Sequence, residues 1–481
     1  MNKLIDKTTK KYVWINGEKV ETENYATLYS PYSREPIAEI AMADAAVTKE
    51  AIRAAYEAKD VIGDMPAYQR AQILENVVNI LTEKAEVAAT IIATESAKPI
   101  VFARAEVART IETYKFSAEE AKRIHGETIP FDAARGGVGR IGYTMKEPIG
   151  VIGAITPFNF PLNLVAHKVG PAIAAGNPIV LKPASQTPLS ALFIAEVFEE
   201  AGLPAGVLNV VTGPGSVVGD VIVEDDRVKM VTFTGSPSVG IGISNKAGLK
   251  KTTLELGSNS ALIIDKDIEI DAIIDRCVMG AFSNQGQVCI SLQRVYVHED
   301  QYSTFVEKFV AATKQLKIGN PLDSETYVSS LITPSELERA LSWIEETKQS
   351  DATILTGGKV QGGILEPTII TNADTCLKVS CQEAFAPIVV VNKIATIEEA
   401  VELVNDSQFG LQAGIYTNNV KHALYASKKL EVGGVMINDV PTYRVDQMPY
   451  GGVKESGTGR EGIKYAVEEM TELKLIVWNQ E

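Results

Sequence analysis

The chain has 481 residues, of which 45% are hydrophobic and 22% are charged, so it has the composition of a water-soluble globular protein with enough apolar side chain for large cores. Its formal net charge of −15 comes from 61 Asp and Glu against 46 Lys and Arg, and an acidic chain without a basic stripe is a poor candidate for binding nucleic acid or an anionic membrane. At ~100–200 residues per domain, we expect two or three domains.

The first third of the chain has the pattern of helices. Its N-terminus is polar and lysine-rich, without the apolar region of a targeting signal. Residues 46–61 and 68–96 are rich in Ala, Glu, Lys and Ile, and a further helical pattern at 104–124 ends at Gly126. The glycine-rich, alternating residues 134–150 then predict a β-hairpin or an extended arm.

From residue 150 onward, short apolar runs alternate with helical segments. This order predicts parallel sheets covered by helices on both faces, and hence an α/β protein. The first series has runs at 150–156, 177–183, 206–213 and 228–235, with helices at 188–201 and 215–223. The second series has runs at 260–265, 294–299, 387–394 and 433–439, with helices at 300–316, 335–349 and 396–405.

Several patterns that mark a membrane, a metal or a disulfide framework are missing from the sequence. The most apolar region, 151–166, is interrupted by prolines and asparagines, so no run reaches the ~18 apolar residues of a membrane span. The four cysteines form no CxxC pair, and the four histidines are scattered. We therefore expect a cytoplasmic protein without a metal site.

Two glycine-rich turns are candidates for holding a dinucleotide. Residues 213–219 (GPGSVVG) and 235–240 (GSPSVG) each follow a predicted strand, where glycines let the backbone approach a pyrophosphate. Neither has the GxGxxG spacing, so either one alone is equally compatible with an ordinary turn. Lys182 ends another strand and is expected at the ligand-binding edge of the sheet; the alternative is a solvated surface lysine.

Cys289 and Glu255 are the candidates for covalent chemistry. Cys289 lies between a turn of small residues and a strand-like run, where a thiolate could attack a carbonyl carbon. A lone cysteine, however, is more often a buried apolar residue. Glu255 ends an apolar run 34 residues earlier and is a candidate general base; the alternatives are a surface charge or a helix-cap partner.

Seven longer motifs follow one another over roughly 300 residues. They are PFNFPL (157–162), LKPASQTP (181–188), FTGSPSVG (233–240), LELGSNSAL (254–262), GQVCIS (286–291), QEAFAPIV (382–389) and MPYGGVKESGTGREG (448–462). In this order they resemble the motifs of the aldehyde dehydrogenase superfamily almost end to end. The chain departs from the family pattern at Ser258 and Ala386, where glycine is usual; both side chains are small.

The resemblance implies a mechanism and its residues. Cys289 would attack the aldehyde and form a thiohemiacetal, and the side chain of Asn159 and the N–H of Cys289 would hold the oxyanion. After hydride transfer to the nicotinamide, Glu255 would activate water to hydrolyse the thioester. The residues implied for binding NADP or NAD are Thr156, Pro157, Lys182, Ser185, Gly213, Gly235, Ser236, Gly257, Glu383 and Phe385.

The resemblance also implies an architecture. We expect a Rossmann-like cofactor domain (1–119 and 142–257), an α/β catalytic domain (258–440), and a β oligomerisation arm with the C-terminal segment (120–141 and 441–481). The apolar strand at 471–479 would be an aggregation hazard as a free edge, so we expect it to take part in a homodimer or a homotetramer.

Three residues bear on the choice of cofactor and substrate: Ser185, Arg444 and Arg109. Relatives that prefer NAD often carry glutamate at the position of Ser185, and a serine there leaves room for the 2′-phosphate of NADP, so we expect NADP to be accepted. Arg444 falls at a substrate-pocket position and could bind a carboxylate, phosphate or sulfonate. The alternative is a surface arginine paired with Asp446. Arg109 is a second candidate anion contact.

Several substrates and functions stay open. Val288 stands where the non-phosphorylating glyceraldehyde-3-phosphate enzymes usually have arginine, which leaves small anionic or hydroxylated aldehydes such as sulfolactaldehyde, succinic semialdehyde and lactaldehyde. A general short-chain aldehyde dehydrogenase, a CoA-acylating enzyme and a non-catalytic protein on the same fold are the alternatives. Glu255 argues against the CoA-acylating enzyme, because such relatives commonly lack it.

Overall fold

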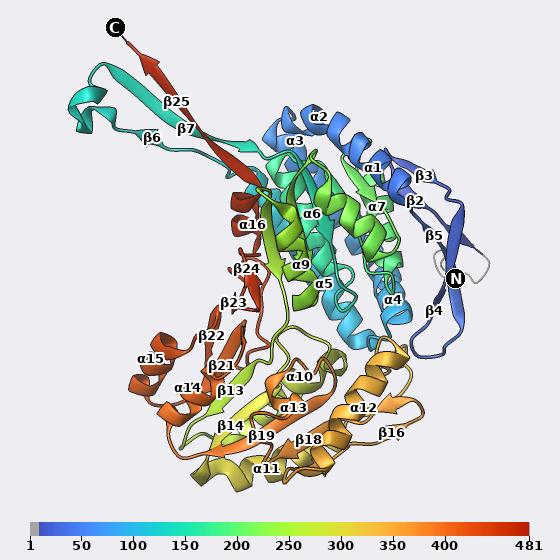
Figure 1. The fold of residues 1–481 in the computed structure, drawn as a ribbon, viewed down its shortest axis with the longest axis vertical. Coiled ribbons are helices and arrows are strands. Elements are labelled where there is room, and N and C mark those ends of the chain that lie inside the picture. Colours follow the sequence, from blue (N-terminus) through green and yellow to red (C-terminus); the bar gives the residue numbers. More distant parts are fainter. Residues whose placement is uncertain (1–8, 481) are drawn as a thin grey trace.

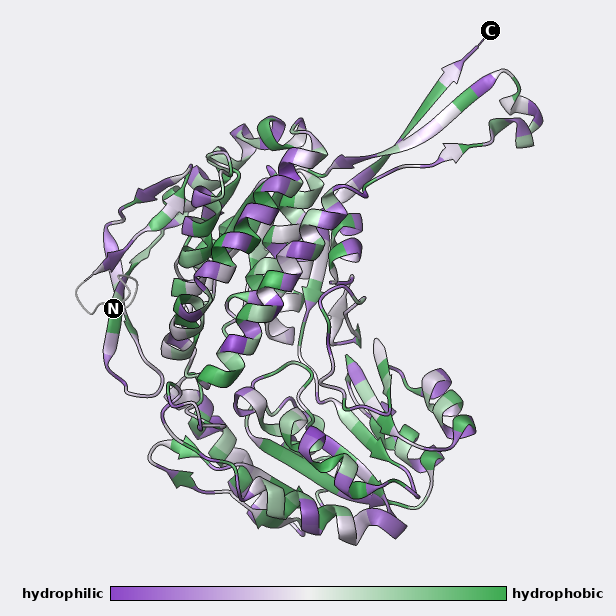
Figure 2. Ribbon diagram, turned by 180° about the vertical axis from the view of Figure 1, so that it is seen from behind, coloured by the Kyte–Doolittle hydropathy of each residue, from purple (hydrophilic) through white to green (hydrophobic). Residues whose placement is uncertain are grey.

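A computed structural model describes residues 9–480 of the chain. It shows two α/β bodies, each built on its own sheet, and a β arm that projects from one of them (Figure 1). Apolar residues concentrate on the strands and on the inner faces of the helices, and polar residues on the outer faces of the helices (Figure 2). The predicted α/β class is therefore confirmed. Among the described helices, none has the length and hydropathy needed to cross a bilayer.

The first body contains an eight-stranded sheet with the order β24-β12-β11-β8-β9-β10-β2-β3. Its five central strands are parallel: β8 (Val151–Ile155), β9 (Ile179–Lys182), β10 (Leu208–Val210), β11 (Val228–Thr234) and β12 (Lys251–Glu255). Antiparallel strands complete both edges: β2 (Val13–Ile15), β3 (Glu18–Val20) and β24 (Gly457–Thr458). The strands predicted from residue 150 to residue 235 all lie in this sheet.

Helices surround this sheet. They are α1 (Ala45–Glu57), α2 (Lys59–Gly63), α3 (Ala67–Glu83), α4 (Ala85–Ser96), α5 (Ile100–Ala121), α6 (Asn163–Ala175), α7 (Pro188–Glu200), α8 (Asp220–Glu224), α9 (Pro237–Ala247) and α16 (Ile463–Glu469). The helix predicted at 68–96 is divided in two at Lys84. Helix α6 was not predicted, because all of its residues are buried and a helix that is apolar on every side lacks the amphipathic period.

The second body contains a seven-stranded sheet with the order β15-β18-β19-β14-β13-β21-β22. Its strands are β13 (Ala261–Ile264), β14 (Arg294–His298), β15 (Thr353–Thr356), β18 (Thr368–Thr371), β19 (Ile388–Ile394), β21 (Gln412–Tyr416) and β22 (Gly434–Ile437). Its helices are α10 (Ile274–Phe282), α11 (Glu299–Thr313), α12 (Pro334–Lys348), α13 (Lys378–Cys381), α14 (Ile397–Asn405) and α15 (Val420–Lys429). Two short pairs accompany them: β16 (Val360–Gln361) with β17 (Ile364–Leu365), and β20 (Phe409–Gly410) with β23 (Val453–Lys454).

The projecting arm is a three-stranded antiparallel sheet with the order β25-β7-β6. It contains β6 (Thr128–Ile129), β7 (Arg140–Pro148) and β25 (Thr471–Asn479). Strand β25 pairs with β7 along its whole length, from Thr471 opposite Pro148 to Asn479 opposite Arg140. A further small sheet of β1 (Lys10–Lys11), β5 (Pro36–Met42) and β4 (Asn24–Tyr29) covers the N-terminal side of the first body (Figure 1).

Candidate active site

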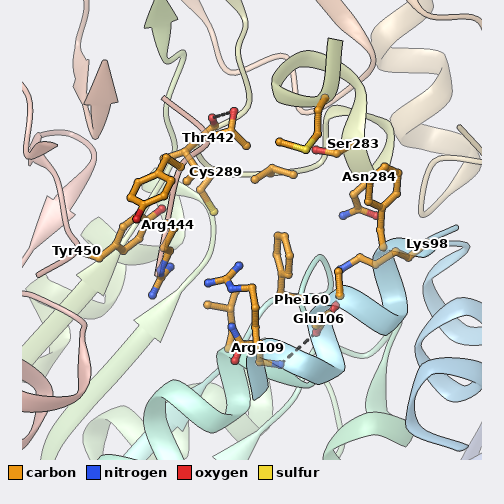
Figure 3. Close-up of a pocket in the computed structure, with 18 of the residues that line it drawn as sticks. Lys98, Glu106, Arg109, Phe160, Ser283, Asn284, Cys289, Thr442, Arg444 and Tyr450 are labelled. Atoms are coloured by element: carbon orange, nitrogen blue, oxygen red, sulfur yellow. Dashed lines mark hydrogen bonds and ion pairs between the residues drawn. The ribbon is translucent and has the colours of Figure 1, made fainter. Parts of the chain in front are cut away.

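A cavity of about 370 Å³ lies where the two bodies meet. Cys289 and Asn284 approach it from the loop after α10, Arg109 from α5 and Phe160 from the loop before α6, and Arg444 faces the same space (Figure 3). The remaining wall is mostly apolar. The cavity therefore brings together side chains that are far apart in the sequence, including both residues singled out above for covalent chemistry, Cys289 and Glu255.

The loop before Cys289 is built from tight turns. Asn284, Gln285 and Gly286 have φ of +50°, +58° and +69°, a left-handed conformation that costs energy in residues other than glycine. The amide of Gln285 donates to the carbonyls of Ala97 and Ser330, both at 3.1 Å. Because buried hydrogen bonds hold these turns, the position of Cys289 is fixed.

Asn159 lies beside the sulfur of Cys289. Its Nδ2 is 3.8 Å from the Cys289 Sγ and donates to the carbonyl of Gln287 at 3.1 Å. The loop that carries Asn159 is anchored by Glu106, whose carboxylate accepts the backbone N–H groups of Leu162 and Asn163 at 2.9 and 3.1 Å. An amide donor held at this place suits the stabilisation of negative charge that develops next to the sulfur.

The Cys289 thiol has a raised pKa, which favours its protonated form. Burial is the main cause that raises its pKa to about 12, the negative charge of Glu383 raises it further, and the hydrogen bond from Asn159 lowers it. The hydrogen bond from Asn159 therefore favours the thiolate, which is the form of the cysteine that attacks a carbonyl carbon.

Glu255 is a buried carboxyl at the end of β12, and its side chain has no hydrogen-bond partner among the described residues. Burial raises its pKa well above the usual value, the negative Glu461 raises it further, and Arg444 and Lys168 oppose the shift. A carboxyl group with free lone pairs and a raised pKa, on the wall of a cavity that also contains a thiol, is a candidate general base.

The candidate cofactor residues lie at the carboxyl ends of the parallel strands. Thr156 and Pro157 follow β8, Lys182 ends β9, Gly213 follows β10, and Gly235 and Ser236 connect β11 to α9. Lys182 is buried, its Nζ donates to the carbonyl of Pro183 at 3.2 Å, and burial lowers its pKa to about 8. Ser185 is exposed, and its hydroxyl lies 3.4 Å from the carbonyl of Gly213.

Glu383 and Phe385 lie in the second body, and Gly257 follows β12 of the first. The carboxylate of Glu383 accepts the N–H of Ser258 at 3.0 Å, and a side chain on Gly257 would lie 2.9 Å from that carboxylate. The Phe385 ring packs edge-on against Phe158, with 5.7 Å between centroids. A close backbone approach, a carboxylate that can accept ribose hydroxyls, and a cation at the strand ends fit a nicotinamide dinucleotide.

Arg444 does not pair with Asp446, and its side chain is only 8% exposed, so its interpretation as a surface arginine was wrong. Its Nη2 donates to Glu461 at 2.9 Å. Asp446 instead binds Arg109 at 2.7 Å and His167 at 2.8 Å.

The sequence analysis did not single out Lys168 and Glu461, a buried ion pair 3.0 Å apart. Glu461 lies in the C-terminal motif and could have been suspected there; Lys168 lies in the unpredicted helix α6.

These features define a class: an oxidoreductase with a cysteine nucleophile beside a dinucleotide site. The family model of the aldehyde dehydrogenase family matches residues 14–476. The chain is 47% identical to a 3-sulfolactaldehyde dehydrogenase of Priestia aryabhattai, with 98% of both chains covered. The chain therefore belongs to the aldehyde dehydrogenase family, and it is an NAD(P)-dependent aldehyde dehydrogenase.

Solved structures show the same fold. Aldehyde dehydrogenase 21 from Physcomitrella patens, in complex with the reaction product succinate, has a TM-score of 0.95 at 40% identity, with 98% of each chain covered. The glyceraldehyde-3-phosphate dehydrogenase GapN from Methanocaldococcus jannaschii, complexed with NADP, has a TM-score of 0.91 at 40% identity, with 95% of this chain and 100% of that chain covered. The predicted fold and family are thus confirmed.

Proposed function

We propose that the protein oxidises a small aldehyde with a single negative charge to its carboxylate, with NADP+ or NAD+ as the hydride acceptor. The observation that carries the proposal is Arg444. Its Nε is buried without a hydrogen-bond partner among the described residues, and the side chain lines the cavity that contains Cys289. A buried, unpartnered donor costs free energy, and the anionic group of a substrate would supply its acceptor.

Arg444 is held in place for this role. Its guanidinium stacks on the ring of Tyr450, 3.6 Å from the centroid, and its Nη2 is fixed by Glu461. The guanidinium is planar and always charged, so a fixed orientation aims its remaining donors in a defined direction. A carboxylate or sulfonate can accept hydrogen bonds from these N–H donors at little cost in the side-chain entropy of Arg444.

The charges around Arg444 favour a singly charged substrate. Arg444, Lys168 and Arg109 are cations, and Glu461 and Asp446 are carboxylates paired with them. His167 is buried, and burial lowers its pKa, which favours its neutral form. These three cations and two carboxylates leave one positive charge in excess, which one anionic group neutralises. A phosphate monoester brings about −1.5 to −2 charge and fits this balance less well.

Two relatives support this substrate class by what they act on. One is the Priestia 3-sulfolactaldehyde dehydrogenase, and the other is the moss enzyme solved with succinate. Sulfolactaldehyde and succinic semialdehyde both carry one anionic group a short reach from the aldehyde. We propose that this chain acts on an aldehyde of this kind.

The reaction begins at Cys289. Its sulfur attacks the aldehyde carbon, and the resulting oxyanion of the thiohemiacetal accepts hydrogen bonds from the Asn159 side chain and the Cys289 N–H. A bound nicotinamide supplies the hydride acceptor that turns this adduct into a thioester. Glu255 then removes a proton from water, which attacks the thioester and releases the carboxylate and the Cys289 thiol. The position of Glu255 on the cavity wall favours hydrolysis over transfer to CoA.

The cofactor residues support the use of NADP+. Lys182 ends β9 and Ser185 follows after Pro183 and Ala184, and neither position carries a carboxylate that would repel a 2′-phosphate. The serine hydroxyl can donate to that phosphate beside the lysine. We propose that NADP+ is accepted and that NAD+ remains usable.

The arm supports self-association. Strand β25 forms an edge of its sheet, with Leu473, Leu475, Val477 and Trp478 between 44% and 66% exposed. An exposed apolar edge strand is an aggregation hazard unless another chain covers it, so we propose a homodimer or homotetramer.

All four cysteines are free thiols, which supports a cytoplasmic location.

The test is NADPH formation with a panel of aldehydes that differ in charge: sulfolactaldehyde, succinic semialdehyde, glyceraldehyde 3-phosphate, lactaldehyde and propanal. The proposal expects the two singly charged aldehydes to have the highest kcat/KM. If propanal or lactaldehyde is oxidised as efficiently, the enzyme is a general short-chain aldehyde dehydrogenase and the proposal fails.

A further inference from the structure

Two cysteines outside the cavity lie beside the loop that carries Glu383. Cys376 is exposed and Cys381 is partly exposed, and they lie just before and at the end of the short helix α13. The Sγ of Cys381 lies 3.5 Å from the carbonyl oxygen of Cys376. That oxygen is two bonds from the Cα of Cys376, so the sulfur of Cys381 already lies against the backbone that bears the other thiol.

The backbone between Cys381 and Glu383 is connected directly to the core. The side chain of Gln293 donates to the carbonyls of Val379 and Gln382 at 2.9 and 2.7 Å, and its oxygen accepts the N–H of Ala384 at 2.9 Å. These bonds fix the two residues on either side of Glu383. Because the one side chain of Gln293 bonds both α13 and the segment around Glu383, a covalent link that moves α13 would also shift the Glu383 carboxylate.

We propose that Cys376 and Cys381 form a reversible oxidation site, in which a peroxide closes a disulfide and thereby weakens cofactor binding. One thiolate attacks a peroxide oxygen, breaks the O–O bond and becomes a sulfenic acid. The second thiolate attacks that sulfur and displaces its oxygen as water once protonated. In total, two thiols and one hydrogen peroxide give one disulfide and two waters. The coupling to the cofactor rests on the role proposed above for Glu383.

The geometry favours this pair over the other two cysteines. Cys277 is buried, which removes it from an oxidant in solution. Cys289 lies on the wall of the cavity, away from this surface pair. A disulfide needs Cα atoms about 4.4–6.8 Å apart, and the 3.5 Å contact between the Cys381 Sγ and the Cys376 carbonyl oxygen brings one sulfur to the backbone of the other cysteine. The negative Asp374 beside Cys376 raises the pKa of that thiol, so the link should form faster as the pH rises.

Peptide mapping tests the link directly. Trypsin cleaves after Lys378, which lies between the two cysteines, so the disulfide would join the peptides 360–378 and 379–393. We expect this joined pair after treatment of the intact enzyme with hydrogen peroxide, its loss on addition of dithiothreitol, and its absence in Cys376→Ser and Cys381→Ser. If the two peptides stay separate while other thiols are oxidised, the proposal is overturned.

A titration of NADPH fluorescence tests the consequence and needs no aldehyde, so its result is independent of the substrate proposed above. We expect the Kd of the oxidised enzyme to rise several-fold and to recover with dithiothreitol, and the Kd of peroxide-treated Cys376→Ser to stay constant. A joined peptide pair with an unchanged Kd would overturn the coupling to Glu383. An equal rise in Cys376→Ser would assign the effect to another thiol and overturn the proposal as well.

Discussion

Glu255 and Arg444 share a feature that few buried polar residues have: each has buried polar atoms without a hydrogen-bond partner among the described residues. In folded proteins most buried polar atoms are bonded, so free ones on one cavity wall mark the places where a substrate or water completes the bonding. Asn159 has the same feature close to this wall: its buried Oδ1 has no partner among those residues, and its Nδ2 lies 3.8 Å from the sulfur of Cys289.

Replacement of Glu255 by Gln separates the two halves of the reaction. Hydride leaves before water attacks, so we expect Glu255→Gln to release about one equivalent of NADPH in a burst and then turn over ~10²–10⁴-fold more slowly than the wild type. Stopped-flow absorbance measures both phases. The matched control is Cys289→Ser, which should give no burst. Wild-type turnover in Glu255→Gln would assign the activation of water to another group.

The buried Lys182 makes cofactor choice depend on pH. Its pKa is lowered to about 8 by burial, so the ammonium form dominates below that pH and is lost above it. Because the cation is what attracts a 2′-phosphate, we expect the KM for NADP+ to rise as the pH passes about 8, while the KM for NAD+ changes less. Initial rates at a series of pH values measure both constants. If the KM values for NADP+ and NAD+ changed in parallel with pH, Lys182 would be excluded as the contact of the 2′-phosphate.

At the scale of elements, the site depends on a few backbone positions that only a small residue can occupy. Gly286 has φ +69°, and a Cβ there would lie 2.2 Å from the carbonyl oxygen of Ala386. The turn before Cys289 and the segment after Glu383 therefore pack backbone to backbone. Ala386, one of the two departures from the family pattern, takes part in this contact through its carbonyl group, so its methyl group does not disturb it.

Substitution of Gly286 by Ala should damage both stability and activity. A positive φ together with the clash costs ~1–3 kcal/mol or more, and the displaced turn carries Cys289. We expect a lower Tm and a reduced kcat. The control is Gly242→Ala in α9, where a Cβ meets nothing within 4 Å and where alanine should stabilise the helix by up to ~0.5–1 kcal/mol. Equal Tm values for the two variants would contradict this account of the turn.

At the scale of the whole molecule, the sequence predicted the strands and helices whose hydrophobic residues recur at a regular spacing, and it missed those whose residues have no such spacing. The runs from residue 150 onward lie in the two sheets, because alternation of strands and helices leaves a regular pattern. The buried helix α6 has no such pattern. The C-terminal motif contains Glu461, but no sequence pattern pairs it with Arg444: Asp446 is two residues from Arg444 in the chain, whereas Glu461 is brought to it only by the fold.

The arm gives a prediction about assembly. Leu475 on β25 is 54% exposed, and a charge there would be buried if a second copy covers the strand. We expect Leu475→Glu to lower the molecular mass in analytical ultracentrifugation to that of a smaller assembly. The control is Leu424→Glu on α15, which introduces the same charge at an exposed leucine (67%) outside the arm and should leave the mass unchanged. An unchanged mass in Leu475→Glu would place the contact between copies elsewhere.

The most direct test of the proposed function compares two four-carbon aldehydes, one ending in a carboxylate and the other in a methyl group. Succinic semialdehyde and butanal have the same length, and the ratio of their kcat/KM values does not depend on the fraction of folded enzyme. A hydrogen bond to a charged group contributes ~1.5–3 kcal/mol, so we expect Arg444→Gln to lower the ratio about 10- to 100-fold. An unchanged ratio in Arg444→Gln would contradict the assignment of Arg444 as the anion contact.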